Sequence, residues 1–319
     1  MLRLLALLAA TPLLAPAAPS TVATAKPLKV FILAGQSNME GAGAVRANPD
    51  RNGGKGSLEH LVKDPATAKR WAHLVDDGGA WAVREDVWIH YFGRRGGLTA
   101  GYGAREDRIG PELGFGHVVG DALEEQVLLI KVAWGGKSLG KDFRPPSAGG
   151  EVGPEYRKLF EEVRAVLDGL EERFEGYDGE GYELAGFAWH QGWNDRVNQA
   201  FNDEYEQNLK CFIRDLREEL DAPDLPFVLA ETGMSGHGEK HPRALSLMRA
   251  QAKVAEDPEF AKTVRFVGTK DFYRPGDESP SNQAYHWNSN AETYLLIGEG
   301  LGRAMLELQP ARKKARRRR

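Results

Sequence analysis

The sequence predicts one α/β domain, a three-layer α/β/α sandwich built on a central parallel sheet. Short, almost continuously apolar segments such as Val127 to Ala133 alternate along the chain with longer segments that have the spacing of amphipathic helices. Strands without polar alternation are typical of parallel sheets, because helices cover both faces of such a sheet. The chain has 319 residues, and we expect residues 27–310 to form this single domain.

The elements follow one another in the order that a parallel sheet requires. Strands are predicted at Lys29 to Ala34, Asp86 to Phe92, Val127 to Ala133, Glu183 to Trp189, Pro226 to Ala230 and Val264 to Thr269. Helices are predicted at Pro111 to Glu125, Tyr156 to Phe174, Asp203 to Leu220, Pro242 to Ala255 and Ala291 to Leu308. The stretch from Ala42 to Gly110 is rich in Gly and Arg, and we expect an insertion over one edge of the sheet.

The two ends of the chain differ from its body. Residues 1–25 have the basic start, the short apolar run and the small-residue cleavage sites of a secretory signal. Residues 311–319 hold seven of the 42 basic residues, and Arg3 lies in the signal. The body therefore has 34 basic and 46 acidic residues, a net charge of −12, which argues against nucleic acid as its partner. The tail is either solvated and disordered or a contact for anionic polymers.

Composition removes several further classes of protein. The one cysteine, Cys211, excludes an intramolecular disulfide framework and a cysteine-based zinc cluster. No stretch after the N-terminus is long and apolar enough to be a membrane span. The sequence has neither a phosphate-binding P-loop nor a dinucleotide fingerprint. We expect no metal and no organic cofactor, since the His237 to His241 segment lacks the spacing of a helical zinc motif.

Four segments are candidates for a functional site, because sites in parallel sheets gather at the carboxyl ends of strands. They are Gly35-Gln36-Ser37-Asn38, Trp134-Gly135-Gly136-Lys137-Ser138, His190-Gln191-Gly192-Trp193-Asn194-Asp195 and His286-Trp287-Asn288. A serine at the start of a helix exposes its hydroxyl near backbone N–H groups that stabilise negative charge. A neutral imidazole beside it can take the hydroxyl proton and return it to a leaving alcohol. Taken singly, an N-cap role for Ser37 and a solvated loop position for His286 remain open.

The segment Phe31 to Gly41, with its Gly-Gln-Ser-Asn-Met core, resembles the first block of the sialate O-acetylesterase-like branch of the SGNH hydrolases. It is also similar to the carbohydrate esterase family 6 acetylxylan esterases. The resemblance extends through all four segments, so it covers nearly the whole mature chain. It implies an SGNH hydrolase-like, flavodoxin-like sandwich.

The resemblance also implies roles for individual residues. Ser37 matches the nucleophile and His286 the base. An oxyanion hole is implied from the Ser37 backbone N–H, a backbone N–H matched by Gly136, and a side-chain amide matched by Asn194. Gln191 is a second amide candidate, because Gln-Gly is the hallmark of the acetylesterase branch. Such preorganised donors are worth about 3 kcal/mol each in the transition state.

Two positions depart from the family pattern. Trp193 stands where the branch usually has a glutamate, and Gln283 stands where the wider family has an aspartate three residues before the histidine. We therefore expect a Ser-His dyad with Gln283 as the candidate third member, or a backbone carbonyl, Asp277 or Glu278 in its place. An amide oxygen fixes the imidazole tautomer but stabilises the imidazolium less than a carboxylate does.

The sequence thus predicts a secreted or periplasmic serine esterase that removes O-acetyl groups from carbohydrates. Trp134, Trp193 and Trp287 lie inside the candidate segments, and indole faces suit the apolar faces of sugar rings. Packing beneath the loops is the alternative for these rings. The alternative function is a non-catalytic carbohydrate-binding protein on the same fold, which the missing aspartate favours. Which acetylated glycan is bound stays open.

Overall fold

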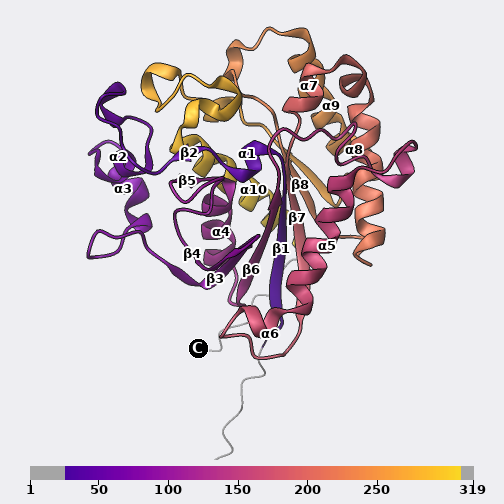
Figure 1. Cartoon of the computed structure of the whole chain (residues 1–319), viewed down its shortest axis with the longest axis horizontal. Helices are drawn as coiled ribbons and strands as arrows, with labels where there is room; N and C mark the ends of the chain where they lie inside the picture. The colour runs from indigo at the N-terminus through magenta and orange to yellow at the C-terminus, as the bar shows by residue number, and fades with distance from the viewer. Residues whose placement is uncertain (1–25, 310–319) are drawn as a thin grey trace, which may run out of the picture.

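The computed structural model describes residues 26–309, which form a central sheet between two layers of helices (Figure 1). Seven strands build the sheet in the order β4-β3-β6-β1-β7-β8-β9. Every neighbouring pair is parallel except β3 and β4, which are antiparallel. The predicted three-layer sandwich is confirmed.

The strand bounds agree closely with the apolar segments of the sequence. The sheet consists of β1 (Leu28–Gly35), β3 (Arg84–Tyr91), β4 (Arg94–Leu98), β6 (Val127–Ala133), β7 (Tyr182–His190), β8 (Phe227–Ala230) and β9 (Val264–Val267). A separate two-stranded pair is formed by β2 (Gly43–Ala44) and β5 (Arg108–Ile109). All six predicted strands are present.

Five long helices cover the sheet. They are α4 (Pro111–Ala122), α5 (Pro154–Asp168), α8 (Gln199–Glu219), α9 (Pro242–Glu256) and α10 (Ala291–Leu308). Five shorter helices are α1 (Ser37–Glu40), α2 (Leu58–Lys63), α3 (Ala68–Trp71), α6 (Leu170–Arg173) and α7 (Trp193–Val197). Single 3₁₀ turns are η1 (Asn52–Gly54), η2 (Ala72–Leu74), η3 (Pro146–Ala148), η4 (Gly236–Gly238), η5 (Lys270–Phe272), η6 (Gly276–Glu278) and η7 (Ala284–Ser289).

The central strand β1 divides the interior into two cores. Successive side chains of a strand point to opposite faces. Phe31 and Leu33 therefore pack with α4 and α10, whereas Val30 and Ile32 pack with α5, α8 and α9. All four side chains are buried, so β1 packs against helices on both faces. This packing fixes the position of the carboxyl end of β1.

Two predictions about the elements need correction. The predicted helix Tyr156 to Phe174 is broken at Gly169 into α5 and α6. The stretch from Ala42 to Gly110 does more than cover an edge, since besides the predicted strand β3 it supplies α2, α3 and a further strand of the sheet, β4. β4 has the sequence Arg-Arg-Gly-Gly-Leu, which lacks an apolar pattern, and it joins the sheet through backbone pairing with β3 at the edge.

Residues 1–25 and 310–319 lie outside the described part of the chain, and with them the predicted signal and the basic tail. Within residues 26–309, no helix combines the length and apolar character needed to cross a membrane. Cys211 is buried in α8.

Candidate active site

Three of the four candidate segments meet at the carboxyl ends of β6, β1 and β7, which are neighbours in the sheet. The backbone N–H of Trp134 donates to the carbonyl of Gly35 at 3.2 Å, and the N–H of Gln36 donates to the carbonyl of His190 at 3.2 Å. Gly35 is required at this junction, because a Cβ there would lie 2.2 Å from the His190 carbonyl oxygen. The chain thus leaves β1 directly between the other two segments.

Ser37 is half-buried and begins the short helix α1. Figure 1 shows α1 at the top of β1. Gly135 lies beside Ser37, since a Cβ on Gly135 would be 3.8 Å from the Ser37 Cβ. Gly136 is exposed at φ +73°, and a Cβ there would meet nothing within 4 Å. Neither the Ser37 nor the Gly136 N–H has a hydrogen-bond acceptor among residues 26–309. Both are therefore available to a ligand.

The buried side chain of Gln36 organises the third segment. Its Oε1 accepts hydrogen bonds from the backbone N–H groups of Gly192 at 3.1 Å and Asn194 at 3.3 Å. Its Nε2 donates to Oδ1 of Asn194 at 3.1 Å. This contact fixes the orientation of the Asn194 amide, so that its nitrogen points away from Gln36. Nδ2 donates to the carbonyl of Gly136 at 2.8 Å. Half-buried Asn194 thus has one further N–H at the edge of the site.

Gln191 has a different environment from Asn194. Its side chain is buried, and its Nε2 lies 2.5 Å from Oδ2 of Asp195 and 3.0 Å from the carbonyl of Lys137. Asp195 is fully buried and also accepts backbone N–H groups of Leu139 and Gly140. Burial raises the pKa of Asp195 to about 6, with these hydrogen bonds opposing the rise. Gln191 therefore serves the junction of two loops, and its candidacy as a direct oxyanion donor is corrected.

The His286 segment is the 3₁₀ turn η7, just before α10. Asn38, the residue after Ser37, donates from Nδ2 to the carbonyl of Tyr285 at 2.9 Å. This contact joins the fourth segment to the helix of the serine. The imidazole of His286 is half-buried, and burial lowers its pKa below the ordinary value. All four segments are thus linked by hydrogen bonds.

No side chain orients the imidazole of His286 by a hydrogen bond within residues 26–309. The side chain of Gln283 is exposed, and its backbone carbonyl accepts the backbone N–H of His286 at 2.8 Å. Asp277 and Glu278 lie exposed in η6 and make no hydrogen bond to the ring. Gln283 therefore contributes a backbone carbonyl to the turn. No contact supports the expectation that its side chain is the third catalytic member.

The tryptophans of the candidate segments differ in exposure. Trp134 is half-buried between Phe92 and Phe143, with ring centroids 5.5 and 6.0 Å away. Trp193 is half-buried, with the Arg196 guanidinium 4.3 Å from its ring centroid. Trp287 is completely buried in the core under the loop. That burial leaves no surface for a sugar, and the prediction of a substrate contact for Trp287 is corrected.

Tyr285 is an aromatic residue of the site that sequence reasoning missed. Its ring is 39% exposed and lies 4.5 Å from the His286 ring and 5.6 Å from the Trp193 ring, centroid to centroid. The exposed tyrosine therefore connects the imidazole to the half-buried tryptophan of α7. Its position directly before His286 was the one sequence feature that pointed to a role in the site, but a tyrosine in a loop can have many other roles.

A buried charge pair supports the floor beneath α1. Nζ of Lys131 lies 2.8 Å from Glu112 and 2.6 Å from the carbonyl of Glu40, and both charged side chains are fully buried. The carboxyl of Glu40 faces Gly135 in return: burial raises its pKa, and the Gly135 N–H opposes that rise. Glu40 thus links α1 to the Gly135-Gly136 loop, a role that only the folded chain reveals.

The histidines of the His237 to His241 segment have other partners. Nε2 of His237 lies 2.6 Å from Asp271 at the surface, and Nδ1 of His241 accepts the N–H of Arg243 at the start of α9. Residues 26–309 contain no cluster of three or more His, Cys, Asp or Glu side chains that could hold a metal.

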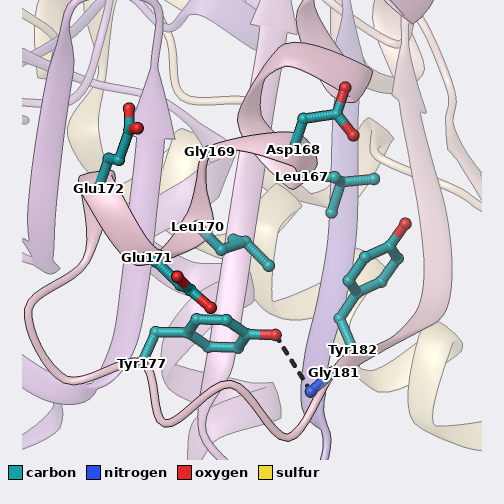
Figure 2. Close-up of a pocket in the computed structure, with 9 residues that line it drawn as sticks. All are labelled: Leu167, Asp168, Gly169, Leu170, Glu171, Glu172, Tyr177, Gly181 and Tyr182. Atoms are coloured by element: carbon teal, nitrogen blue, oxygen red, sulfur yellow. Dashed lines mark hydrogen bonds between the residues drawn. The ribbon is translucent and has the colours of Figure 1, made fainter.

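A separate pocket lies at the opposite edge of the sheet, between the end of α5, α6 and the start of β7 (Figure 2). Asp168, Glu171 and Glu172 line it, and the hydroxyl of Tyr177 accepts the N–H of Gly181 at 3.1 Å. It contains none of the candidate residues.

The seven-stranded sheet, with helices on both faces, gives the protein a three-layer α/β/α fold of the SGNH-like class. A family model described as carbohydrate esterase, sialic acid-specific acetylesterase, matches residues 27–307, and the chain belongs to this family. It is accordingly a carboxylic ester hydrolase of the carbohydrate acetylesterase type.

Solved structures share the fold at low sequence identity. A protein from Arabidopsis thaliana aligns at 18% identity with a TM-score of 0.58, covering 88% of this chain and 99% of that one. A carbohydrate acetylesterase from Xanthomonas citri, XAC1771, aligns at 14% identity and a TM-score of 0.54, covering 88% of this chain but 56% of that one. NanS aligns at 16% identity and a TM-score of 0.51, covering 89% and 98%. No curated protein sequence matches significantly.

Proposed function

We propose that the protein removes O-acetyl groups from carbohydrates by an acyl-enzyme mechanism in which Ser37 is the nucleophile and His286 the base. The observation that carries the proposal is the junction of four distant segments around Ser37, through Gly35, Gln36 and Asn38. Each segment brings one part of the chemistry of ester hydrolysis: a hydroxyl, a backbone donor, an amide donor and an imidazole.

The reaction has two balanced halves. Oγ of Ser37 attacks the acetyl carbonyl carbon as its proton passes to His286, and the resulting oxyanion is bound by the proposed donors. The carbon–oxygen bond to the sugar then breaks, and His286 returns the proton to the departing sugar oxygen. Water, deprotonated by the same imidazole, attacks the carbonyl carbon of the acetyl-serine. The bond from this carbon to Oγ then breaks, His286 returns the proton to Oγ of Ser37, and acetate leaves.

Three groups are proposed as the oxyanion hole: the N–H groups of Ser37 and Gly136 and the Nδ2 of Asn194. The two backbone groups have no acceptor within the described chain, as a donor reserved for a ligand requires. The Gln36 contact favours Asn194 over Gln191, because it directs the amide nitrogen of Asn194 toward Gly136.

A dyad without a carboxylate suits an ester substrate. A sugar alcohol leaves more readily than an amine, so the less stabilised imidazolium suffices for esters. The alternative, a non-catalytic carbohydrate-binding protein, draws its support from this same missing carboxylate. Export through residues 1–25 and a contact of the basic tail with anionic polymers are also proposals, and both concern residues outside the described chain.

The proposed function is tested by acetate release. The purified protein is incubated with acetylated xylan, O-acetylated sialic acid and a small aryl acetate, beside the Ser37→Ala variant. We expect release by the wild type from an aryl acetate and from at least one glycan, and release that is slower by about 10⁴-fold or more by the variant. A folded wild type that hydrolyses no ester, but binds the glycans, would establish the binding-protein alternative.

Tyr285→Ala is expected to weaken binding of the sugar and to have a smaller effect on the rate of the chemical step. The exposed ring beside His286 offers an apolar face for a sugar, and truncation of such a contact costs about 1 kcal/mol or more. We expect KM for an acetylated glycan to rise about 5- to 10-fold, while KM for an aryl acetate changes less. Equal changes for both substrates would contradict a sugar contact. Tyr182→Ala, an exposed tyrosine of the opposite edge, is the control.

The pH dependence of kcat/KM follows from the burial of His286. Because burial lowers the pKa of this imidazole, the neutral base persists to lower pH than a free histidine does, whose pKa is about 6.5. We expect the acid limb of kcat/KM to have its midpoint below that value. A midpoint above about 7 would contradict this, because it would require a negative group acting on the ring.

Stability has to be recorded over the same pH range. His190 is fully buried, and burial lowers its pKa to about 3, whereas the unfolded chain protonates it near 6.5. The unfolded state therefore binds the extra proton, and the contribution of His190 to stability is lost progressively as pH falls from about 6.5 toward 3. Circular dichroism at each pH separates this loss from titration of His286.

A further inference from the structure

Asn38, directly after the proposed nucleophile, is bonded through both ends of its amide. Its side chain is 1% exposed. Nδ2 donates to the carbonyl of Tyr285 at 2.9 Å, and Oδ1 accepts the hydroxyl of Tyr294 at 2.7 Å. The Tyr294 hydroxyl also lies 3.3 Å from the carbonyl of His286. The amide therefore cannot turn without losing a buried hydrogen bond.

These contacts join three elements that are remote in sequence. Asn38 belongs to α1, Tyr294 to α10, and the two carbonyls belong to η7, which carries the imidazole. Asn38 and Tyr294 are both buried, so the hydrogen bond between their side chains is shielded from water. In such surroundings a lost partner leaves an unsatisfied polar group, which makes the arrangement well defined.

The turn that carries His286 depends on outside support. The three residues that follow it, Trp287, Asn288 and Ser289, have φ values of +50°, +54° and +58°, a left-handed conformation that side chains disfavour. The imidazole has no hydrogen bond of its own within residues 26–309. The place of the ring is therefore set by its backbone, and the Asn38 cluster is what ties that backbone to the helix of Ser37.

We propose that Asn38 is a positioning residue, which holds the backbone of His286 in register with Ser37. The proposal rests on the proposed function. Asn38 touches neither serine hydroxyl nor substrate in this scheme, so it acts on the proton transfer through the position of the imidazole. A buried asparagine that merely satisfies polar groups would stabilise the fold and leave the rate of folded molecules unchanged.

Two variants separate positioning from stability. Asn38→Ala removes both halves of the contact, and Tyr294→Phe removes only the hydroxyl, with little change in packing. We expect kcat on an aryl acetate to fall about 10- to 100-fold for Asn38→Ala and about 5-fold for Tyr294→Phe, with KM within about 3-fold, because small displacements of a catalytic group have effects of this order.

The matched control is Asn202→Ala. Asn202 is also a buried asparagine whose Nδ2 donates to a backbone carbonyl, that of Arg243 at 2.9 Å, but it joins α8 to α9. We expect this variant to lose stability and to keep its kcat. A fall in kcat as large as that of Asn38→Ala would overturn the proposal, since any buried amide would then have the same effect.

The decisive readout is the double variant with His286→Ala. If Asn38 acts through the imidazole, adding Asn38→Ala to His286→Ala changes the residual rate by less than about 2-fold. Effects that multiply in full, or an unchanged kcat in a folded Asn38→Ala, would overturn the proposal. If Asn38→Ala does not fold, Tyr294→Phe is combined with His286→Ala in its place. An unchanged kcat in Tyr294→Phe overturns the proposal. A lower kcat that is not lowered further when His286→Ala is already present supports it. Should His286→Ala itself retain full activity, the proposed function fails and this inference with it.

Discussion

Ser37→Ala is expected to lower kcat for ester hydrolysis by about 10⁴-fold or more, the order seen when the nucleophile of a hydrolase is removed. In the proposed mechanism this hydroxyl forms the bond to the acetyl group, so its removal eliminates the acyl-enzyme route. His286→Ala is expected to cost about 10³-fold or more. The measurement is acetate release from an aryl acetate under saturating conditions.

The combination of the two variants tests the dyad. Residues that act as a unit are not additive, so Ser37→Ala with His286→Ala should be no slower than Ser37→Ala alone. Ser147→Ala, which changes an exposed serine of η3, is the control and should keep full activity. A Ser37→Ala protein that stays folded and retains its rate would refute the acyl-enzyme mechanism. Full multiplication of the two effects would refute the dyad.

The elements that local sequence determines were predicted well. β6 and α10 agree with their predicted bounds. A short segment that is apolar except for Lys131 indicates a buried strand, and a long amphipathic period indicates a helix. β4 escaped prediction, since its Arg-Arg-Gly-Gly-Leu sequence is held by the backbone of β3 and not by an apolar face. The break of the predicted helix at Gly169 is likewise a local event within a longer periodic pattern.

The candidate site was predictable where its residues lie within a motif and not where they act across the fold. Ser37 and Gly136 follow strands, so the topology alone brings them together. The choice between Gln191 and Asn194 depends on buried Asp195, whose need for donors occupies Gln191. The left-handed turn after His286 places Trp287 in the core. Such a turn cannot be predicted from the periodicity of apolar residues in the sequence.

The amide of Asn194 offers the most specific test of the oxyanion hole. Asn194→Ala removes the Nδ2 donor, and loss of one such donor costs about 10²- to 10³-fold in kcat, or about 3 to 4 kcal/mol. KM should change little, because the donor is needed most when charge develops on the oxygen. The measurement is kcat and KM on an aryl acetate and on an acetylated glycan.

Asn194→Asp is a second test of the Asn194 donor, because the new side chain has almost the same size and shape. The carboxylate keeps an acceptor for Nε2 of Gln36, but the group that faces Gly136 becomes an oxygen, which loses the hydrogen bond to the Gly136 carbonyl and repels it. Negative charge there opposes the developing oxyanion, and kcat should therefore fall further than in Asn194→Ala. If Asn194→Asp is as active as the wild type, Asn194 is not a donor. The hole then consists of the Ser37 and Gly136 N–H groups alone, because the Gln191 amide is buried and bonded to Asp195.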